Sequence, residues 1–224
     1  MICTARLTPA CESWVGLALL GVLSLPAARH ALESSMTLHM LVQYPLLALS
    51  GIFLAGAFPS LWRRHVNAWN AYGIAGLFAT ALVMAVLMIP RALDLALVDA
   101  RIEFAKMIAL VLCGMALRFS WRPAGLLVQG FFLGNVLPMV AAAGQLYHDS
   151  PARVCNAYLL DDQMGLGGML VGVTVAVGLA WLSQFVVAMM RREAAATLPP
   201  NTGSMPRDPV RKKLPGKKNV EKVV

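Results

Sequence analysis

The residues of this sequence best suited to chemistry are one histidine and several methionines. Met36, His39 and Met40 are spaced so that a helix would place all three on one face. Thioether sulfur and imidazole nitrogen are ligands that suit Cu(I). Met88 and Met107 stand near the ends of two other apolar segments, at a depth where a helical bundle could bring them to the same place. The pattern predicts a copper site made of these five residues.

The same residues also have a simpler interpretation. The chain holds 13 methionines, and methionine is a common filler of irregular gaps in apolar cores. A single histidine at the end of a span is more often hydrogen-bonded than bound to metal. Spacing alone leaves both interpretations open.

Motifs for other chemistry are absent from the sequence. It contains no phosphate-binding loop, no dinucleotide-binding glycine motif, no zinc-protease motif and no serine-hydrolase elbow. We therefore expect that the protein is not an enzyme.

Composition indicates the elements that must position the copper site. Of 224 residues, 58% are hydrophobic and 13% charged, against roughly 25% charged in soluble domains. These values exclude an ordinary soluble enzyme and a disordered protein. Because a membrane-crossing helix needs ~20 apolar residues, we predict an all-α, polytopic integral membrane bundle of about six transmembrane helices in residues 1–190. The predicted spans are 14–28, 36–58, 70–90, 104–120, 124–146 and 164–190. The short first segment could instead be a cleaved signal peptide.

Small residues indicate how two of these helices pack. Gly130 with Gly134, and Gly168 with Gly172, have the spacing that lets membrane helices approach closely. We expect the fifth and sixth spans to pack through these glycines.

The net charge of +8 is unevenly distributed. With six spans, most Lys and Arg fall on the side of both termini, in the loop with Arg63 and Arg64 and in the tail 191–224. The positive-inside rule then makes both termini cytoplasmic, in a multi-pass protein of the bacterial inner membrane. The tail is predicted to be disordered and to attract anionic lipid. It has no aromatic residue to stack on bases, so no nucleic-acid partner is expected.

The outer side carries most of the acids and three of the four histidines. Glu103 and Lys106, three residues apart near the start of the fourth span, are expected to form an ion pair with each other. Asp162 and Gln163 directly precede the sixth span, where they would cap its open amides.

Several motifs occur together in an order that resembles a known family. The motifs are His39-Met40 followed by Pro45-Leu46-Leu47 and Gly51, then Pro90-Arg91-Ala92-Leu93-Asp94, then Leu146-Tyr147, and finally Asp162-Gln163 with Gly167-Gly168-Met169. Across roughly residues 33–185 the chain resembles the polytopic CtaG family of cytochrome c oxidase assembly proteins. Two departures concern the metal site. Leu87-Met88-Ile89 stands where the family has Trp-His before the proline, and Lys106-Met107 where it has Glu-His.

The resemblance implies a role in assembly or copper supply of a heme-copper oxidase or a related copper enzyme at the outer, periplasmic face. It implies oxidase subunits or a copper chaperone as partners, and copper as the cofactor. The residues it carries over are His39, Met40, Tyr147, Asp162 and Gln163. Two alternatives stay open on the sequence: a small metal-ion transporter or channel, and a ligand-free structural subunit packed through the fifth and sixth spans.

Overall fold

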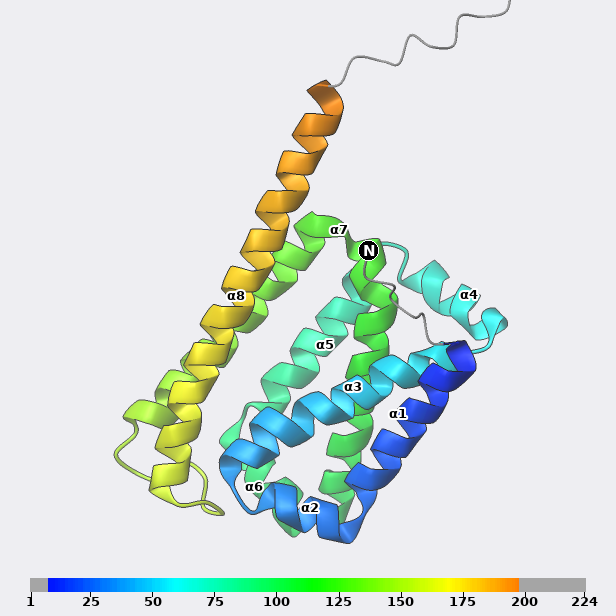
Figure 1. The fold of residues 1–224 in the computed structure, drawn as a ribbon. Coiled ribbons are helices and arrows are strands. Elements are labelled where there is room, and N and C mark those ends of the chain that lie inside the picture. Colours follow the sequence, from blue (N-terminus) through cyan, green and yellow to red (C-terminus); the bar gives the residue numbers. More distant parts are fainter. Residues whose placement is uncertain (1–7, 198–224) are drawn as a thin grey trace, which may run out of the picture. The chain divides into compact units, whose positions relative to one another are not determined.

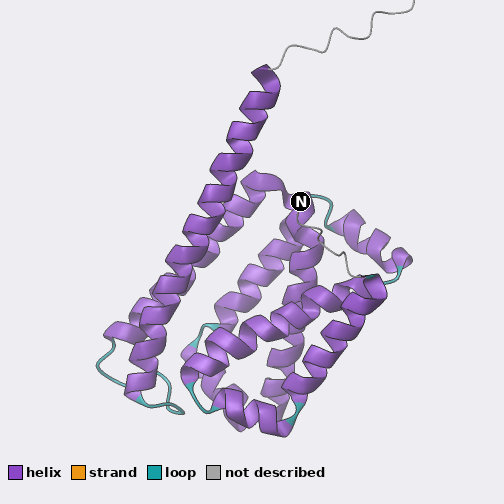
Figure 2. Ribbon diagram, viewed as in Figure 1, coloured by secondary structure: helices purple, strands orange, loops and turns teal. Residues whose placement is uncertain are grey.

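The computed structural model describes residues 8–197, and these residues form helices and no strand (Figures 1 and 2). The elements, in chain order, are α1 (Pro9–Ser24), α2 (Pro26–Glu33), the π-helix η1 (Leu38–Gln43), α3 (Tyr44–Leu54), the short 3₁₀ helix η2 (Ala55–Ala57), α4 (Ser60–Trp69), α5 (Ile74–Leu87), α6 (Pro90–Val98), α7 (Ala100–Asp149) and α8 (Leu160–Thr197). The predicted all-helical class is confirmed.

Three of the described helical segments are long and apolar enough to cross a membrane: Leu38–Ala57, Ala100–Asp149 and Leu160–Ala194. Two bent pairs, α1 with α2 at 71° and α4 with α5 at 85°, raise the number to five if each pair is one span. The count of six predicted from the sequence is not reached in this way, because the fourth and fifth predicted spans both fall within α7.

Proline and glycine set the breaks between these helices. Leu25 is extended, as expected for a residue before proline, so α1 ends before Pro26 and the predicted span 14–28 covers the end of α1 and the start of α2. Gly73, directly before α5, has φ +69°, a left-handed conformation that glycine adopts readily and that allows the chain to turn between α4 and α5. Gly125, at φ 61° and ψ 178°, interrupts α7. The arms 100–124 and 126–149 meet at this break and diverge from it (Figure 1). Residues of both arms line one pocket.

The residues predicted to bind copper lie next to an unusual turn. Pro45 has no amide donor, and its ring crowds the carbonyl four residues earlier. The preceding turn is widened into the π-helix η1, a feature often found at functional sites. This turn directs His39, Met40 and Gln43 into the protein interior, where all three are buried.

The core is built around the first arm of α7, which packs against α3 and α5, while α1 packs on α3. Gly51 and Gly114 allow the closest approach: a Cβ at either position would overlap a backbone carbonyl of the facing helix. The second arm meets α8 at Gly144 and Gly167. The predicted contacts at Gly134, Gly168 and Gly172 are wrong, since a Cβ there would have no neighbour within 4 Å among the described residues.

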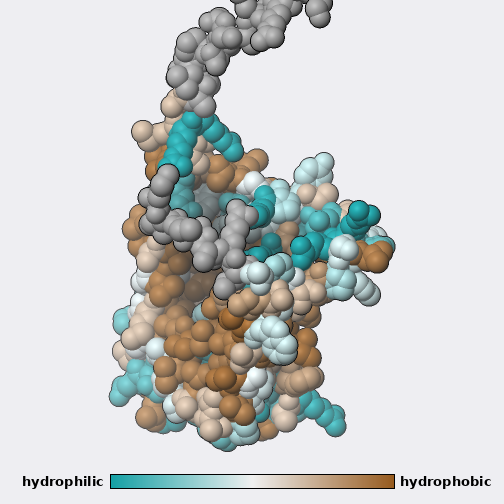
Figure 3. Space-filling view, turned by 45° about the vertical axis from the view of Figure 1, so that its right-hand side comes forward, coloured by the Kyte–Doolittle hydropathy of each residue, from teal (hydrophilic) through white to brown (hydrophobic). Residues whose placement is uncertain are grey.

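Large apolar side chains cover much of the outer surface, including Phe78 at 70% and Leu127 at 86% exposure. On the face in Figure 3 they form a broad apolar area with hydrophilic residues above and below it. Such a surface is typical of helices that contact lipid.

The chain divides at Leu182 into two units. The described part of the second unit is the continuation of α8, which remains helical to Thr197, past the predicted end at 190. The rest of the predicted disordered tail, residues 198–224, lies outside the described residues.

Candidate functional site

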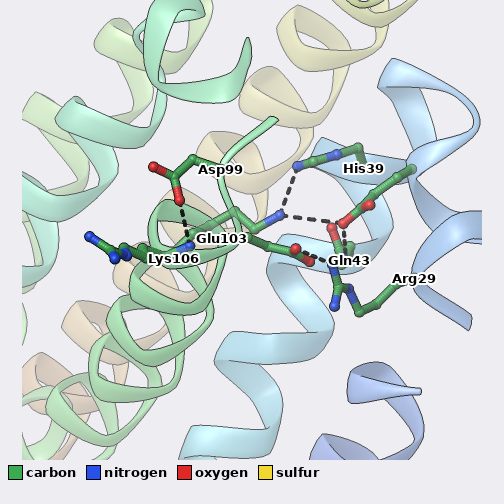
Figure 4. A network of polar contacts seen from close by, with 8 residues as sticks. Arg29, His39, Gln43, Asp99, Glu103 and Lys106 are labelled. Carbon is green, nitrogen blue, oxygen red and sulfur yellow. Dashed lines mark hydrogen bonds and ion pairs between the residues drawn. The ribbon is translucent and has the colours of Figure 1, made fainter. Parts of the chain in front are cut away.

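A cluster of buried and partly buried polar side chains joins α2, η1, the first turns of α7 and the loop between α7 and α8. We define the polar cluster as Arg29, Glu33, His39, Gln43, Glu103, Lys106 and Tyr158; Figure 4 labels five of these residues. Helical spacing within η1 puts His39 and Gln43 on one side of the turn, and the same spacing in α7 presents Glu103 and Lys106 toward them. Charged groups inside an apolar helical bundle are costly to bury and are therefore candidates for a function.

Both ring nitrogens of His39 are bonded within this cluster. Nε2 lies 3.2 Å from Lys106 Nζ, and Nδ1 lies 3.0 Å from the hydroxyl of Tyr158. An ammonium has no acceptor, so Nε2 accepts from Lys106, and Nδ1 carries the proton and donates to Tyr158. In this arrangement His39 has no lone pair free for a metal, and copper binding by His39 remains a prediction that requires these bonds to break.

The two charged residues of α7 pair with α2, not with each other. Glu103 forms its ion pair with Arg29, and Lys106 Nζ lies 3.7 Å from the Glu33 carboxylate. The expected pair of Glu103 with Lys106 is therefore wrong. Helical spacing made that pair possible, but α2 supplies each of the two residues with a partner of opposite charge from a different element.

Some buried polar atoms of this region have no hydrogen-bond partner within the described part of the chain. They are Arg29 Nε, Gln43 Oε1, Tyr44 Oη and Glu103 Oε1. Tyr44 also contacts His39 edge-on, with ring centroids 5.3 Å apart, and Lys106 Nζ lies 5.9 Å from the centre of the Tyr44 ring. Buried polar groups are usually satisfied, so these unpaired atoms distinguish the polar cluster and the adjoining Tyr44 from the rest of the described core.

The methionines predicted to join His39 share one core. Met36 and Met40 are buried in the main hydrophobic cluster, and Met88 and Met107 are partly buried against it. The structure therefore brings all four to the same core, although it does not arrange them around the imidazole, whose nitrogens already have partners.

A sulfur-lined pocket lies beside the polar cluster. Met40, Met84, Met88 and Cys113 line a cavity of about 280 Å³ together with Tyr44 and apolar residues of α3, α5, α7 and α8. Met36, His39 and Met107 are not among its lining residues. Met84 and Cys113 were not predicted, because only methionines near span ends stand out in the sequence. The spacing of Met84 and Met88, one turn apart on the same helix, could have revealed the first of them.

The remaining family-motif residues hold the loop between α7 and α8. Gln163 accepts from the amides of Val154 at 2.8 Å and Cys155 at 3.4 Å, and donates to the carbonyl of Tyr147. The Tyr147 hydroxyl in turn donates to the carbonyl of Met88. Helix α8 begins at Leu160, so Asp162 and Gln163 lie inside its first turn, and the prediction that they precede the helix is wrong. Gln163 holds amides of the preceding loop and not amides of α8. Asp162 is half-buried beside it.

The clamped loop buries Cys155, which leads to a prediction about its reactivity. Burial, with a smaller contribution from the charge of Asp94, raises the pKa of the Cys155 thiol to about 12. The thiolate is the reactive form, so between pH 9 and 10 Cys155 is expected to react with iodoacetamide on the order of 100-fold more slowly in the folded protein than after unfolding. Mass spectrometry of peptides measures both rates, with the exposed Cys11 as control.

The raised pKa of Cys155 also makes the folding stability depend on pH. The unfolded thiol ionises near pH 9 and the folded one near pH 12, so the folded state loses stability from this group as the pH rises through that window. In the iodoacetamide experiment, equal labelling rates of Cys155 before and after unfolding would contradict its burial.

The described residues also limit the kind of metal site that this region could form. No group of three or more His, Cys, Asp or Glu side chains between residues 8 and 197 is placed to hold a metal ion. A metal site in this region would therefore depend on thioether ligands, which suit Cu(I). The sulfur-lined pocket offers three thioethers and one thiol.

In comparisons with known proteins, no family model, no curated protein and no solved structure matches this chain. Membership of the CtaG family therefore stays a prediction that depends on the short motifs around His39, Pro90, Tyr147 and Gln163.

Proposed function

We propose that the chain is a six-span protein of the bacterial inner membrane. At 1.5 Å per residue, the 50 residues of α7 would extend about 75 Å as one straight helix, more than twice the ~30 Å hydrocarbon core of a bilayer. The interruption at Gly125 supports two separate crossings by the arms 100–124 and 126–149. Together with the two bent pairs, Leu38–Ala57 and α8, these arms make six spans.

The proposed orientation has both termini in the cytoplasm. Arg118, in the last two turns of the first arm of α7, forms an ion pair with Glu12 at the start of α1, with Nη2 and Oε2 3.0 Å apart. Arg63 of α4 donates to the carbonyls of Ala55 and Gly56 at 3.4 Å. These contacts gather basic residues at the end of the bundle where α1 begins, which supports the positive-inside assignment of that end.

The function that we propose is handling of Cu(I) during assembly or copper supply of a heme-copper oxidase or a related copper enzyme. The observation that carries it is the sulfur-lined pocket: Met40, Met84, Met88 and Cys113 line one largely apolar cavity. Soft sulfur ligands select Cu(I) over harder ions, and an apolar wall limits access of water. In this proposal copper is a cargo, held and passed to a partner, and no reaction is catalysed.

The direct test is Cu(I) binding by the purified full chain, measured by competition with a chromogenic Cu(I) chelator. The wild type is expected to bind about one Cu(I). Replacing Met40, Met84 and Met88 together by leucine removes three sulfurs at similar volume. Loss of outer-shell groups alone lowers metal affinity about 10–100-fold, so loss of three ligands is expected to exceed that range.

The matched control is Met169→Leu, at an exposed position of α8 outside the pocket. It is expected to keep wild-type affinity. Absence of Cu(I) binding by the wild type would overturn the copper function. Unchanged affinity in the triple variant would overturn the assignment of the pocket.

A deletion strain tests the biological role. Loss of oxidase activity that added copper restores is the expected result. Loss of metal uptake with intact oxidase activity would favour the transporter or channel. Stable co-purification with a metal-free complex would favour the structural subunit.

A further inference from the structure

A second pocket lies at the opposite end of the bundle from the polar cluster, and it is lined by arginines. We define the basic pocket as the cavity of about 730 Å³ bordered by Arg63 and Asn67 of α4 and by Arg118, Trp121 and Arg122 of α7. Its remaining lining residues are apolar or small and come from α3, η2 and α7: Ile52, Ala55, Gly56, Leu117, Phe119 and Pro123. The pocket thus combines positive charge with an apolar wall.

The positive charge of the basic pocket is only partly compensated. Arg118 is paired with Glu12. Arg63 donates to two backbone carbonyls, and neither Arg63 nor Arg122 forms an ion pair with any residue between 8 and 197. Two guanidinium groups therefore remain without an acidic partner in the described chain. The planar fork of a guanidinium matches a phosphate group with two parallel hydrogen bonds.

The surroundings of the basic pocket place it at the level of lipid headgroups. Helix α4 is bent by 85° from α5. In the proposed six-span arrangement α5 carries the crossing of this pair, and α4 turns away from it. It exposes Trp62 at 65% and Trp69 at 89%, beside basic residues. Tryptophan and basic side chains on a helix lying across the end of a bundle are typical of the membrane interface.

We propose that the basic pocket binds the phosphate headgroup of an anionic phospholipid. Arg63 and Arg122 would contact the phosphate, and the apolar wall of Ile52, Leu117 and Phe119 would contact an acyl chain. Basic pockets between helices on the cytoplasmic side are suited to such headgroups. A free phosphate ion would match the arginines but would leave the apolar wall without a partner, which is why the lipid is favoured.

The test uses the full chain in detergent, titrated with phosphatidylglycerol or phosphatidylcholine and followed by native mass spectrometry. The wild type is expected to retain phosphatidylglycerol in preference to phosphatidylcholine. Each arginine near a membrane surface contributes enough that its loss weakens anionic-lipid binding about fivefold. The double variant Arg63→Gln/Arg122→Gln is therefore expected to bind phosphatidylglycerol about 25-fold more weakly.

The matched control is Arg91→Gln/Arg153→Gln, which removes the same charge from two exposed positions outside the pocket. It is expected to bind phosphatidylglycerol like the wild type. Equal weakening in both double variants would overturn the proposal in favour of nonspecific attraction. Inorganic phosphate provides the second arm: displacement of phosphatidylglycerol by millimolar phosphate would identify a free-anion site and also overturn it.

Discussion

Replacing Lys106 by methionine is expected to destabilise the protein more than any other single side-chain change in the polar cluster. The Lys106 side chain is 1% exposed, and its ammonium contacts Glu33 and His39. Its loss leaves the Glu33 carboxylate, which is 13% exposed, without its cation. Removing one partner of a buried ion pair costs about 3–5 kcal/mol. The unfolding midpoint of detergent-solubilised protein, measured in a denaturant series, reports this loss.

Two further variants make this expectation specific. Arg101→Met removes a cation from an exposed position in the first turn of the same helix and is expected to leave the midpoint nearly unchanged. Glu33→Gln in the Lys106→Met background removes the unpaired carboxylate and is expected to restore part of the lost stability. If the double variant is as unstable as the single one, the Lys106–Glu33 pair is not the source of the effect.

The ion-pair partners of Lys106 and Glu103 could not be predicted from the sequence. Local spacing pairs Glu103 with Lys106, because both lie on one helical face. The structure joins Glu103 to Arg29 and Lys106 to Glu33. Which helix packs on that face depends on the path of the chain between α2 and α7, and a pattern within α7 carries no information about that path.

The helices themselves were more predictable, because their causes are local. Apolar runs predicted most of the long apolar helices, and Pro26 and Pro45 mark the points where the structure breaks or widens the helix. The residues of the sulfur-lined pocket were harder to predict from the sequence. Met40 and Met88 could be found as methionines at span ends, whereas Cys113 lies in the middle of an arm of α7, where nothing in the sequence distinguishes it from core filling.

The glycines in the predicted spacing pattern are not the ones where the helices approach most closely. Gly134 and Gly168 belong to small-residue patterns that predicted close helix packing, yet both face open space in the described structure. Gly114 belongs to no such predicted pattern. Nevertheless, a Cβ at Gly114 would overlap the carbonyl oxygen of Ala48 and lie 3.0 Å from the amide nitrogen of Ile52. The contact depends on where α3 crosses α7, not on a repeat along either helix.

Gly114→Ala is therefore expected to lower stability strongly, and Gly134→Ala to raise it slightly. Overpacking a core costs about 1–3 kcal/mol and occasionally more, and the upper part of that range applies because the obstacle at Gly114 is the backbone of α3. At Gly134 the added methyl group meets nothing within 4 Å, so only the gain from replacing glycine inside a helix remains, about 0.5–1 kcal/mol.

The two alanine variants should thus shift the denaturant midpoint in opposite directions, although the chemical change is identical. A shift of equal sign and size would mean that α3 and the first arm of α7 do not approach through Gly114. Because Met40 lies just before α3 and Cys113 precedes Gly114 directly, this close approach also brings the two walls of the sulfur-lined pocket together. Gly114→Ala is accordingly expected to weaken Cu(I) binding as well as stability, whereas Gly134→Ala should leave Cu(I) binding unchanged.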